Sequence, residues 1–97
     1  MVPEFEINTE NGPNPDNMIV DLNGFYIHMM DFIVNAIKLK HNKNKLCTFI
    51  DEDKNIFTST LDKDGYTTSL KKCLVYFEKE EEFERCTIIK SLINERI

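Results

Sequence analysis

The sequence lacks several features that would place the chain in a familiar class. Its three cysteines, Cys47, Cys73 and Cys86, form no CxxC pair, and an odd number leaves one thiol outside any disulfide scheme. Its three glycines form no phosphate-binding pattern. The most apolar stretch, residues 25–39, is too short and too polar to span a bilayer, and no secretion signal is recognisable at the first residues. We therefore expect a soluble chain with reduced thiols and no contact with a membrane.

The composition also limits the classes of function. The chain has 97 residues, enough for one domain with its own core, and a net charge of −5, which argues against broad binding to nucleic acid or to anionic membranes. Alanine occurs once, whereas Ile, Lys and Asn supply about a third of the residues. This usage is typical of AT-rich genomes and suggests a phage or a low-GC bacterium. The expected location is the cytoplasm, or the virion if a phage encodes the protein.

One amphipathic stretch, residues 23–42, organises the rest of the sequence. Its apolar residues recur at helical spacing. Its polar residues are spaced three, four and three apart and form one narrow strip: His28, Asp31, Asn35 and Lys38. Because a helix with so thin a polar strip must be covered on most of its circumference, we predict a central core helix. It should begin with Asn23 as N-cap and end near His41.

Three short segments predict a small sheet. Phe5 and Ile7 alternate with glutamates, which favours a short edge strand. Residues 46–50 and 55–61 are rich in β-branched and aromatic residues and flank the charged segment 51–54, a pattern typical of a β-hairpin. Residues 8–17 are expected to be a loop or mobile arm. Residues 18–22 fit either a strand or an early start of the central helix.

The hairpin segment also resembles a calcium-binding loop. Acidic and polar residues occupy five ligand positions of an EF-hand pattern: Asp51, Asp53, Asn55, Ser59 and Asp62. However, Ile56 stands where that loop needs a glycine, and Asp62 stands where a longer glutamate normally binds the ion. A plain hairpin turn is therefore the prediction, and we expect no metal and no other cofactor.

The last third of the chain predicts a helical pair. A turn at residues 62–65 should precede a helix over residues 69–79, capped by Thr67 or Thr68, and a second helix should cover roughly residues 82–96. The apolar positions at helical spacing are Leu70, Cys73, Leu74 and Phe77 in the first helix, and Phe83, Cys86, Ile89 and Ile93 in the second. No proline or glycine separates the two segments, so one continuous helix is the alternative.

Residues 82–93, Glu-Phe-Glu-Arg-Cys-Thr-Ile-Ile-Lys-Ser-Leu-Ile, resemble the UVR motif, an antiparallel helical hairpin of bacterial excision-repair proteins and of some Clp-protease regulators. The positions that match in type are Phe83, Glu84, Arg85, Cys86, Ile89, Lys90 and Ile93, with Thr87 as an acceptable small residue. Ser91 replaces an expected Asp, and Ile88 replaces an expected polar residue. The resemblance implies docking to another helical hairpin, often in a dimer, and implies no catalysis.

The basic residues gather in one cluster: Lys38, Lys40, His41, Lys43 and Lys45. The simplest interpretation is that these cations complement the dipole of the preceding helix and keep the loop solvated. Contact with a phosphate backbone is a second interpretation, although no aromatic residue is interleaved for base stacking. An acidic protein partner is the third.

Candidates for chemistry are few. His28 and Asp31 lie three residues apart on the polar strip and could form an oriented pair, but the cysteines that might serve as nucleophiles lie in apolar segments, where thiols are usually inert. A metal site from His28, Asp31 and His41 is limited by reach, because thirteen helical residues separate the two histidines by about 20 Å. The acidic run at residues 78–84 is either a solvated turn or a mimic of nucleic-acid phosphates that could inhibit a basic host protein.

Together these patterns predict a single α+β domain: an N-terminal strand and loop (1–17), a core helix with a hairpin (18–65), and a C-terminal antiparallel helical pair (66–97). We expect a non-enzymatic protein-interaction module that docks through its last two helices, as a homodimer or as an accessory subunit of a phage or bacterial assembly. The residues expected to contact the partner are Phe77, Phe83, Ile88, Ile89, Leu92 and Ile93. The alternatives are an acidic inhibitor or a small nucleic-acid-associated regulator that uses Lys38, Lys40, Lys43 and Lys45.

Overall fold

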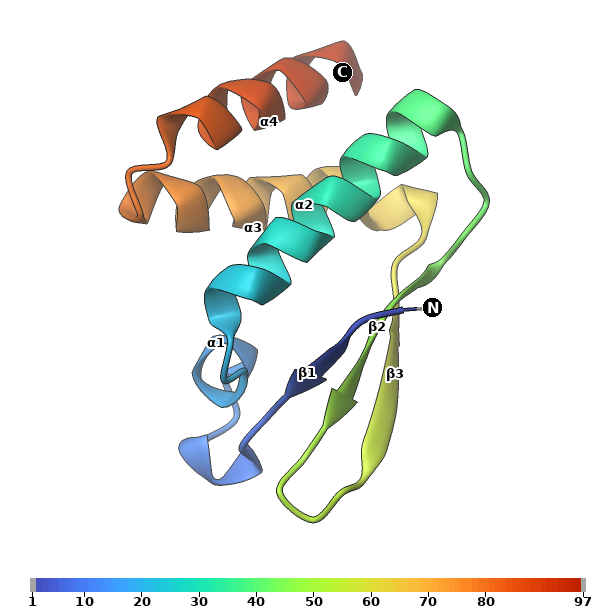
Figure 1. The fold of residues 1–97 in the computed structure, drawn as a ribbon. Coiled ribbons are helices and arrows are strands. Elements are labelled where there is room, and N and C mark those ends of the chain that lie inside the picture. Colours follow the sequence, from blue (N-terminus) through green and yellow to red (C-terminus); the bar gives the residue numbers. More distant parts are fainter. Residues whose placement is uncertain (1, 97) are drawn as a thin grey trace.

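Helices cover one face of a small three-stranded sheet in the computed structural model, which describes residues 2–96 (Figure 1). The elements follow in the order β1 (Glu4–Glu6), α1 (Pro15–Met18), α2 (Leu22–Leu39), β2 (Lys45–Ile50), β3 (Ile56–Thr60), α3 (Tyr66–Lys79) and α4 (Phe83–Arg96). Short 3₁₀ turns precede α1 and α3, at Thr9–Asn11 and Lys63–Gly65. The α+β prediction is confirmed. Among the described residues, no helix combines the length and the apolar character needed to cross a membrane.

The sheet has the strand order β1-β2-β3. β1 runs parallel to β2, with Phe5 beside Phe49, and β3 runs antiparallel to β2, with Phe57 beside Phe49. The predicted hairpin and the predicted N-terminal edge strand are therefore both present. An irregularity in the register between Lys45 and Cys47 allows two successive residues of β2, Leu46 and Cys47, to be buried.

The central helix α2 begins slightly earlier than the sequence suggested. Its N-cap is Asp21, whose carboxylate accepts a hydrogen bond from the backbone N–H of Gly24 at 3.0 Å, so the prediction of Asn23 as N-cap is wrong. The predicted strand over residues 18–22 does not form: Met18 ends α1, and Leu22 is already the first residue of α2. Instead Ile19 makes an isolated antiparallel bridge to Ile7, and the segment lies along the outer edge of β1.

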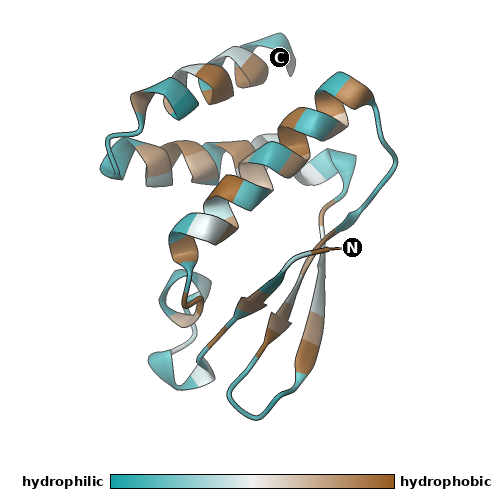
Figure 2. Cartoon of the chain, viewed as in Figure 1, coloured by the Kyte–Doolittle hydropathy of each residue, from teal (hydrophilic) through white to brown (hydrophobic). Residues whose placement is uncertain are grey.

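The core lies between α2, the inner face of the sheet and the α3–α4 pair. Figure 2 shows hydrophobic residues recurring along α2. Its side chains that pack inward are Tyr26, Met29, Met30, Phe32, Ile33 and Ala36. Of the predicted polar strip, Asp31, Asn35 and Lys38 are exposed, as expected for the one face that the rest of the chain leaves open to solvent.

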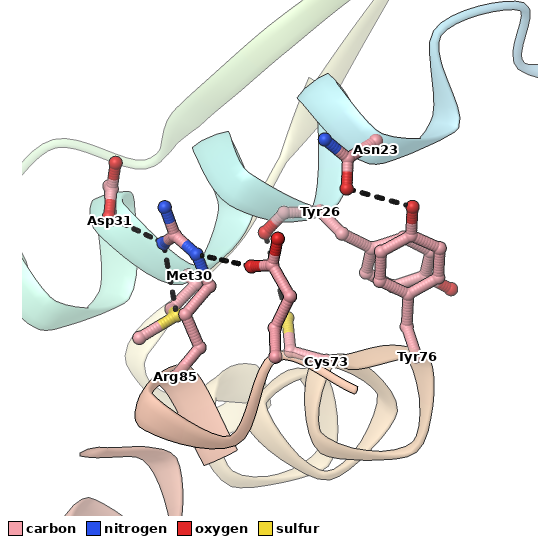
Figure 3. A network of polar contacts seen from close by, with 8 residues as sticks. Asn23, Tyr26, Met30, Asp31, Cys73, Tyr76 and Arg85 are labelled. Carbon is pink, nitrogen blue, oxygen red and sulfur yellow. Dashed lines mark hydrogen bonds and ion pairs between the residues drawn. The ribbon is translucent and has the colours of Figure 1, made fainter. Parts of the chain in front are cut away.

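A pair of stacked tyrosines ties the N-terminal part of the chain to α3 (Figure 3). The ring centroids of Tyr26 and Tyr76 lie 4.4 Å apart. The hydroxyl of Tyr26 donates to Asp16 at 2.9 Å, and the hydroxyl of Tyr76 donates to Asn23 at 3.0 Å. Burial, followed by the nearby Asp16 carboxylate, raises the pKa of Tyr26, so this phenol stays a hydrogen-bond donor at any physiological pH.

The two C-terminal helices are separate, so the alternative of one continuous helix is wrong. α3 begins at Tyr66 rather than Ser69, and its N-cap is Gly65 rather than Thr67 or Thr68, because the 3₁₀ turn leads directly into the helix. The turn between α3 and α4 needs neither glycine nor proline. Glu81 adopts the left-handed conformation, with φ of 57°, that ends the helix and reverses the chain.

Candidate functional site

The turn between α3 and α4 is a fixed corner. The N–H of Glu82 donates to the carbonyl of Phe77 at 2.9 Å, and the N–H of Glu81 donates to that of Glu78 at 3.2 Å. These two bonds, together with the left-handed Glu81, make up a Schellman motif, which satisfies the carbonyls at the end of α3. The corner therefore holds the first residue of α4 in a defined position.

Arg85 fastens this corner to α2 (Figure 3). Its Nε donates to Glu82 at 2.9 Å, and its Nη1 lies 3.9 Å from a carboxylate oxygen of Asp31 on α2. Its guanidinium carbon lies 5.5 Å from the centre of the Phe77 ring, within the range of a cation–π contact. One side chain thus links the last turn of α3, the first turn of α4 and the middle of α2.

The residues predicted to contact a partner fall into two groups. Phe77, Ile89, Leu92 and Ile93 are buried in the core of the chain itself, so they present no surface to another molecule. Phe83 and Ile88 are exposed, by 65% and 45%. Helical periodicity explains the division, because five residues separate these two positions and place them about 140° apart, on opposite flanks of the buried stripe of α4. The predicted continuous apolar face of α4 is therefore an inward face.

Phe83 lies at the corner among acidic side chains. Glu80, Glu81 and Glu84 are exposed around it, while Glu82 is held by Arg85. Only part of the acidic run predicted as a turn is one: residues 80–82 connect the helices, whereas Glu78 belongs to α3, and the exposed Phe83 and Glu84 begin α4. Sequence periodicity alone assigned Phe83 to the buried stripe, because it lies three residues before Cys86, and only the helix boundary shows that it lies outside the core.

The basic cluster surrounds a pocket of about 500 Å³ between the end of α2 and the start of α3. The titratable side chains of its lining, apart from Tyr66, are Lys40, His41, Lys43, Asp62 and Lys63. Lys38 and Lys45, the other two lysines of the predicted nucleic-acid site, are exposed but do not line it. The pocket gains Lys63 from a distant part of the sequence, a contribution that no local pattern indicated.

The polar strip of α2 does not join His28 to Asp31. Nε2 of His28 lies 2.7 Å from the carbonyl oxygen of Leu46, and because a carbonyl only accepts, the histidine must donate this hydrogen bond. Asp31 instead faces Arg85. His28 therefore connects α2 to β2, and Asp31 connects α2 to α4.

The three cysteines are free and buried, and they contribute to the core. Burial raises the pKa of Cys47 to about 11 and that of Cys73 to about 12, so both stay as thiols near neutral pH. The thiol of Cys73 points at the carbonyl of Tyr26, at 4.0 Å. These positions fit the prediction that the cysteines are packing groups.

Hydrogen bonds to the carboxylate of Asp51 hold the acidic hairpin turn in its conformation. The Asp51 carboxylate accepts from the N–H of Asp53 at 2.9 Å, from the N–H of Asn55 at 2.8 Å and from the Asn55 amide at 3.0 Å. Desolvation alone would raise the pKa of Asp51, but these hydrogen bonds outweigh it and lower the pKa. Glu52 accepts hydrogen bonds from the backbone and the hydroxyl of Thr9. Within residues 2–96, no group of three His, Cys, Asp or Glu side chains could hold a metal ion.

Comparison of the chain with protein families, with curated proteins and with solved structures found no match. The resemblance of residues 82–93 to the UVR motif consequently stays a prediction.

Proposed function

We propose that the chain is a non-enzymatic interaction module that docks onto another protein through the corner between α3 and α4. The observation that carries the proposal is Phe83, a large aromatic side chain that is 65% exposed on a turn fixed by the Schellman motif and by Arg85. Aromatic side chains held in a defined position are typical anchors of protein interfaces, because little conformational freedom is lost when they bind.

The surroundings of Phe83 specify the chemistry of the partner. The exposed carboxylates of Glu80, Glu81 and Glu84 create a negative rim around the ring. A matching surface has an apolar pocket bordered by lysines or arginines, since complementary charges steer association and disfavour wrong partners. This partner chemistry accommodates both an accessory subunit of a larger assembly and an acidic inhibitor of a basic host protein.

The test is retention of a partner from a lysate of the source organism by the tagged chain. Phe83→Ala should abolish retention, and a Glu80→Lys/Glu84→Lys variant should weaken it and reduce its sensitivity to salt. Val20→Ala is the matched control, because Val20 is 66% exposed on a different part of the molecule. Retention that is unchanged by Phe83→Ala, or lost equally with Val20→Ala, would contradict docking through the corner.

A second candidate function rests on the basic pocket. Lys40, Lys43 and Lys63 line a cavity of about 500 Å³ together with Asp62, which leaves an excess of positive charge there on a chain whose net charge is −5. A phosphate-bearing ligand such as a nucleic-acid backbone suits this chemistry. Fluorescence anisotropy with labelled single-stranded DNA and RNA tests it. Binding should fall steeply with salt and disappear in a Lys40→Glu/Lys43→Glu variant, but persist in Lys71→Glu, which changes an exposed lysine on α3.

A further inference from the structure

The outer edge of β3 is open. β3 is the terminal strand of the sheet, and among the described residues β2 is the one strand that pairs with it. Its residues run Ile56-Phe57-Thr58-Ser59-Thr60, with no proline and no charge. Ile56 and Phe57 are exposed by 66% and 49%. Protein edges of this kind are usually blocked by lysine, proline or a bulge within the strand, and β3 has none of these.

The hydrogen bonds of the hairpin identify which backbone groups face outward. The N–H of Asp51 donates to the carbonyl of Asn55 at 3.1 Å, and the N–H of Leu61 donates to the carbonyl of Asn44 at 2.7 Å. Alternate residues of a strand direct their backbone groups to opposite edges, so the odd-numbered residues of β3 bond to β2. The outward groups belong to Ile56, Thr58 and Thr60, and in the described chain no hydrogen bond from their backbone groups joins β3 to a segment outside the β2–β3 ladder.

The charges that flank β3 make the strand complementary to itself. Lys54 precedes the strand and Asp62 follows it, and Thr58 lies midway between them in the sequence. If two copies of β3 pair antiparallel about a two-fold axis at Thr58, then the end of the strand that follows Lys54 in one copy lies beside the end that precedes Asp62 in the other. The same register sets Thr58 opposite Thr58 and Ile56 opposite Thr60. All of these strand residues carry outward backbone groups, as a hydrogen-bonded pair requires.

We propose that β3 pairs antiparallel with β3 of a second copy, in the register centred on Thr58, to form a continuous six-stranded sheet. The pairing covers the half-exposed ring of Phe57 and the side chain of Ile56. It brings no two charges of the same sign together, because Lys54 and Asp62 flank opposite ends of the strand. Because the strand has only five residues, the contact area is small and the dimer should be weak and concentration-dependent. This surface does not include Phe83, so a dimer would present two copies of the docking corner.

Analytical ultracentrifugation over a wide concentration range tests the pairing. The wild-type chain should shift from its 11.4 kDa monomer to twice that mass as concentration rises. Thr58→Pro should remain monomeric, because it removes an outward N–H and leaves the bonds to β2 in place. Lys54→Glu and Asp62→Lys should each weaken the dimer, and the double variant should restore it. Phe83→Ala should not affect it, so this proposal and the docking proposal can fail separately.

Two cysteine variants, compared by oxidative cross-linking, determine the register of the paired strands. This test does not require the proline variant to fold. Under mild oxidation, Thr58→Cys should form a disulfide-linked dimer, since paired residues at the two-fold axis lie within disulfide range. Thr60→Cys is the matched control on the same face, and it should cross-link far less because its counterpart is Ile56. A wild-type monomer at every concentration would overturn the proposal. A dimer that persists in Thr58→Pro, or equal cross-linking of the two cysteine variants, would place the second copy elsewhere and also overturn it.

Discussion

The α3–α4 pair and the strand β3 contain similar apolar side chains but place them differently. In the helical pair, Phe77 and Ile89 are completely buried in the core. In β3, Ile56 and Phe57 remain half or more exposed beside an open hydrogen-bonding edge. The comparison shows that the apolar content of a segment did not predict whether its apolar side chains are exposed. The helical pair, which is richer in aliphatic residues, contributes buried side chains to the core, whereas the shorter and more polar strand pairs with β2 on one edge alone.

The largest expected effect separates a buried phenylalanine from an exposed one. Phe77→Ala should destabilise the fold by about 3–5 kcal/mol, because it leaves a cavity between α2, α3 and α4 and removes the ring under Arg85. Phe83→Ala removes the same atoms and should change stability by no more than about 0.5 kcal/mol. Urea unfolding followed by circular dichroism measures both. Equal losses for the two variants would show that the exposed ring of Phe83 contributes to the core.

The next effect concerns the attachment of the helical pair to α2. Arg85→Ala should cost about 1 kcal/mol, since it removes a cation–π contact and two partly exposed ion pairs. Arg85→Lys should lose less, because the charge remains although the planar fork is absent. Denaturant midpoints of the two variants and the wild type measure these losses of stability. An alanine variant as stable as the wild type would mean that the corner is held by its backbone alone.

A stabilising change is expected at the turn itself. Glu81→Gly should gain about 0.5–1 kcal/mol, because glycine relieves a left-handed strain of about 1–2 kcal/mol while adding some chain entropy to the unfolded state. Glu80→Gly is the control: Glu80 has φ of −86°, and the same substitution there relieves no strain and should destabilise. Thermal melts that show Glu81→Gly to be as harmful as Glu80→Gly would contradict the assigned turn.

The smallest expected effect concerns the hairpin and depends on pH. The folded pKa of Asp51 lies below its ordinary value of 3.8, so its ionised form stabilises the fold fully above that pH. The contribution disappears as the pH falls through the folded pKa. The wild type should therefore be more stable than Asp51→Asn at pH 7, and the difference should shrink below about pH 4. Urea midpoints for both chains at a series of pH values test this. A stability difference that grows as the pH falls would contradict a lowered pKa of Asp51.

Much of the fold could be predicted because its signals are local. The alternation around Phe5, the β-rich segments on either side of Asp51 and the helical spacing from Phe25 onward indicated the strands, the hairpin and the central helix. The N-caps were less predictable, since Asp21 and Asn23 are both good caps and only the path of the preceding segment selects between them. The helix break at Glu81 carries no residue signature, because the left-handed residue there is not glycine.

The candidate sites depended on tertiary structure and were harder to predict. Phe83 and Ile89 both belong to a helical apolar pattern, and only the folded structure shows that the first is exposed and the second buried. Lys63 reaches the basic pocket from the far side of the hairpin. The open edge of β3 follows from strand order, which no single segment encodes.

The central claim, that the open edge of β3 pairs with a second copy, can be tested directly by residue-resolved amide hydrogen exchange at low and high protein concentration. The structure predicts that the amides of Phe57 and Ser59 are protected at both concentrations, because they bond to β2. The amides of Ile56, Thr58 and Thr60 should exchange quickly in dilute solution and slow markedly in concentrated solution. Exchange at these three amides that is independent of concentration, or protection that develops along α4 instead, would contradict the claim.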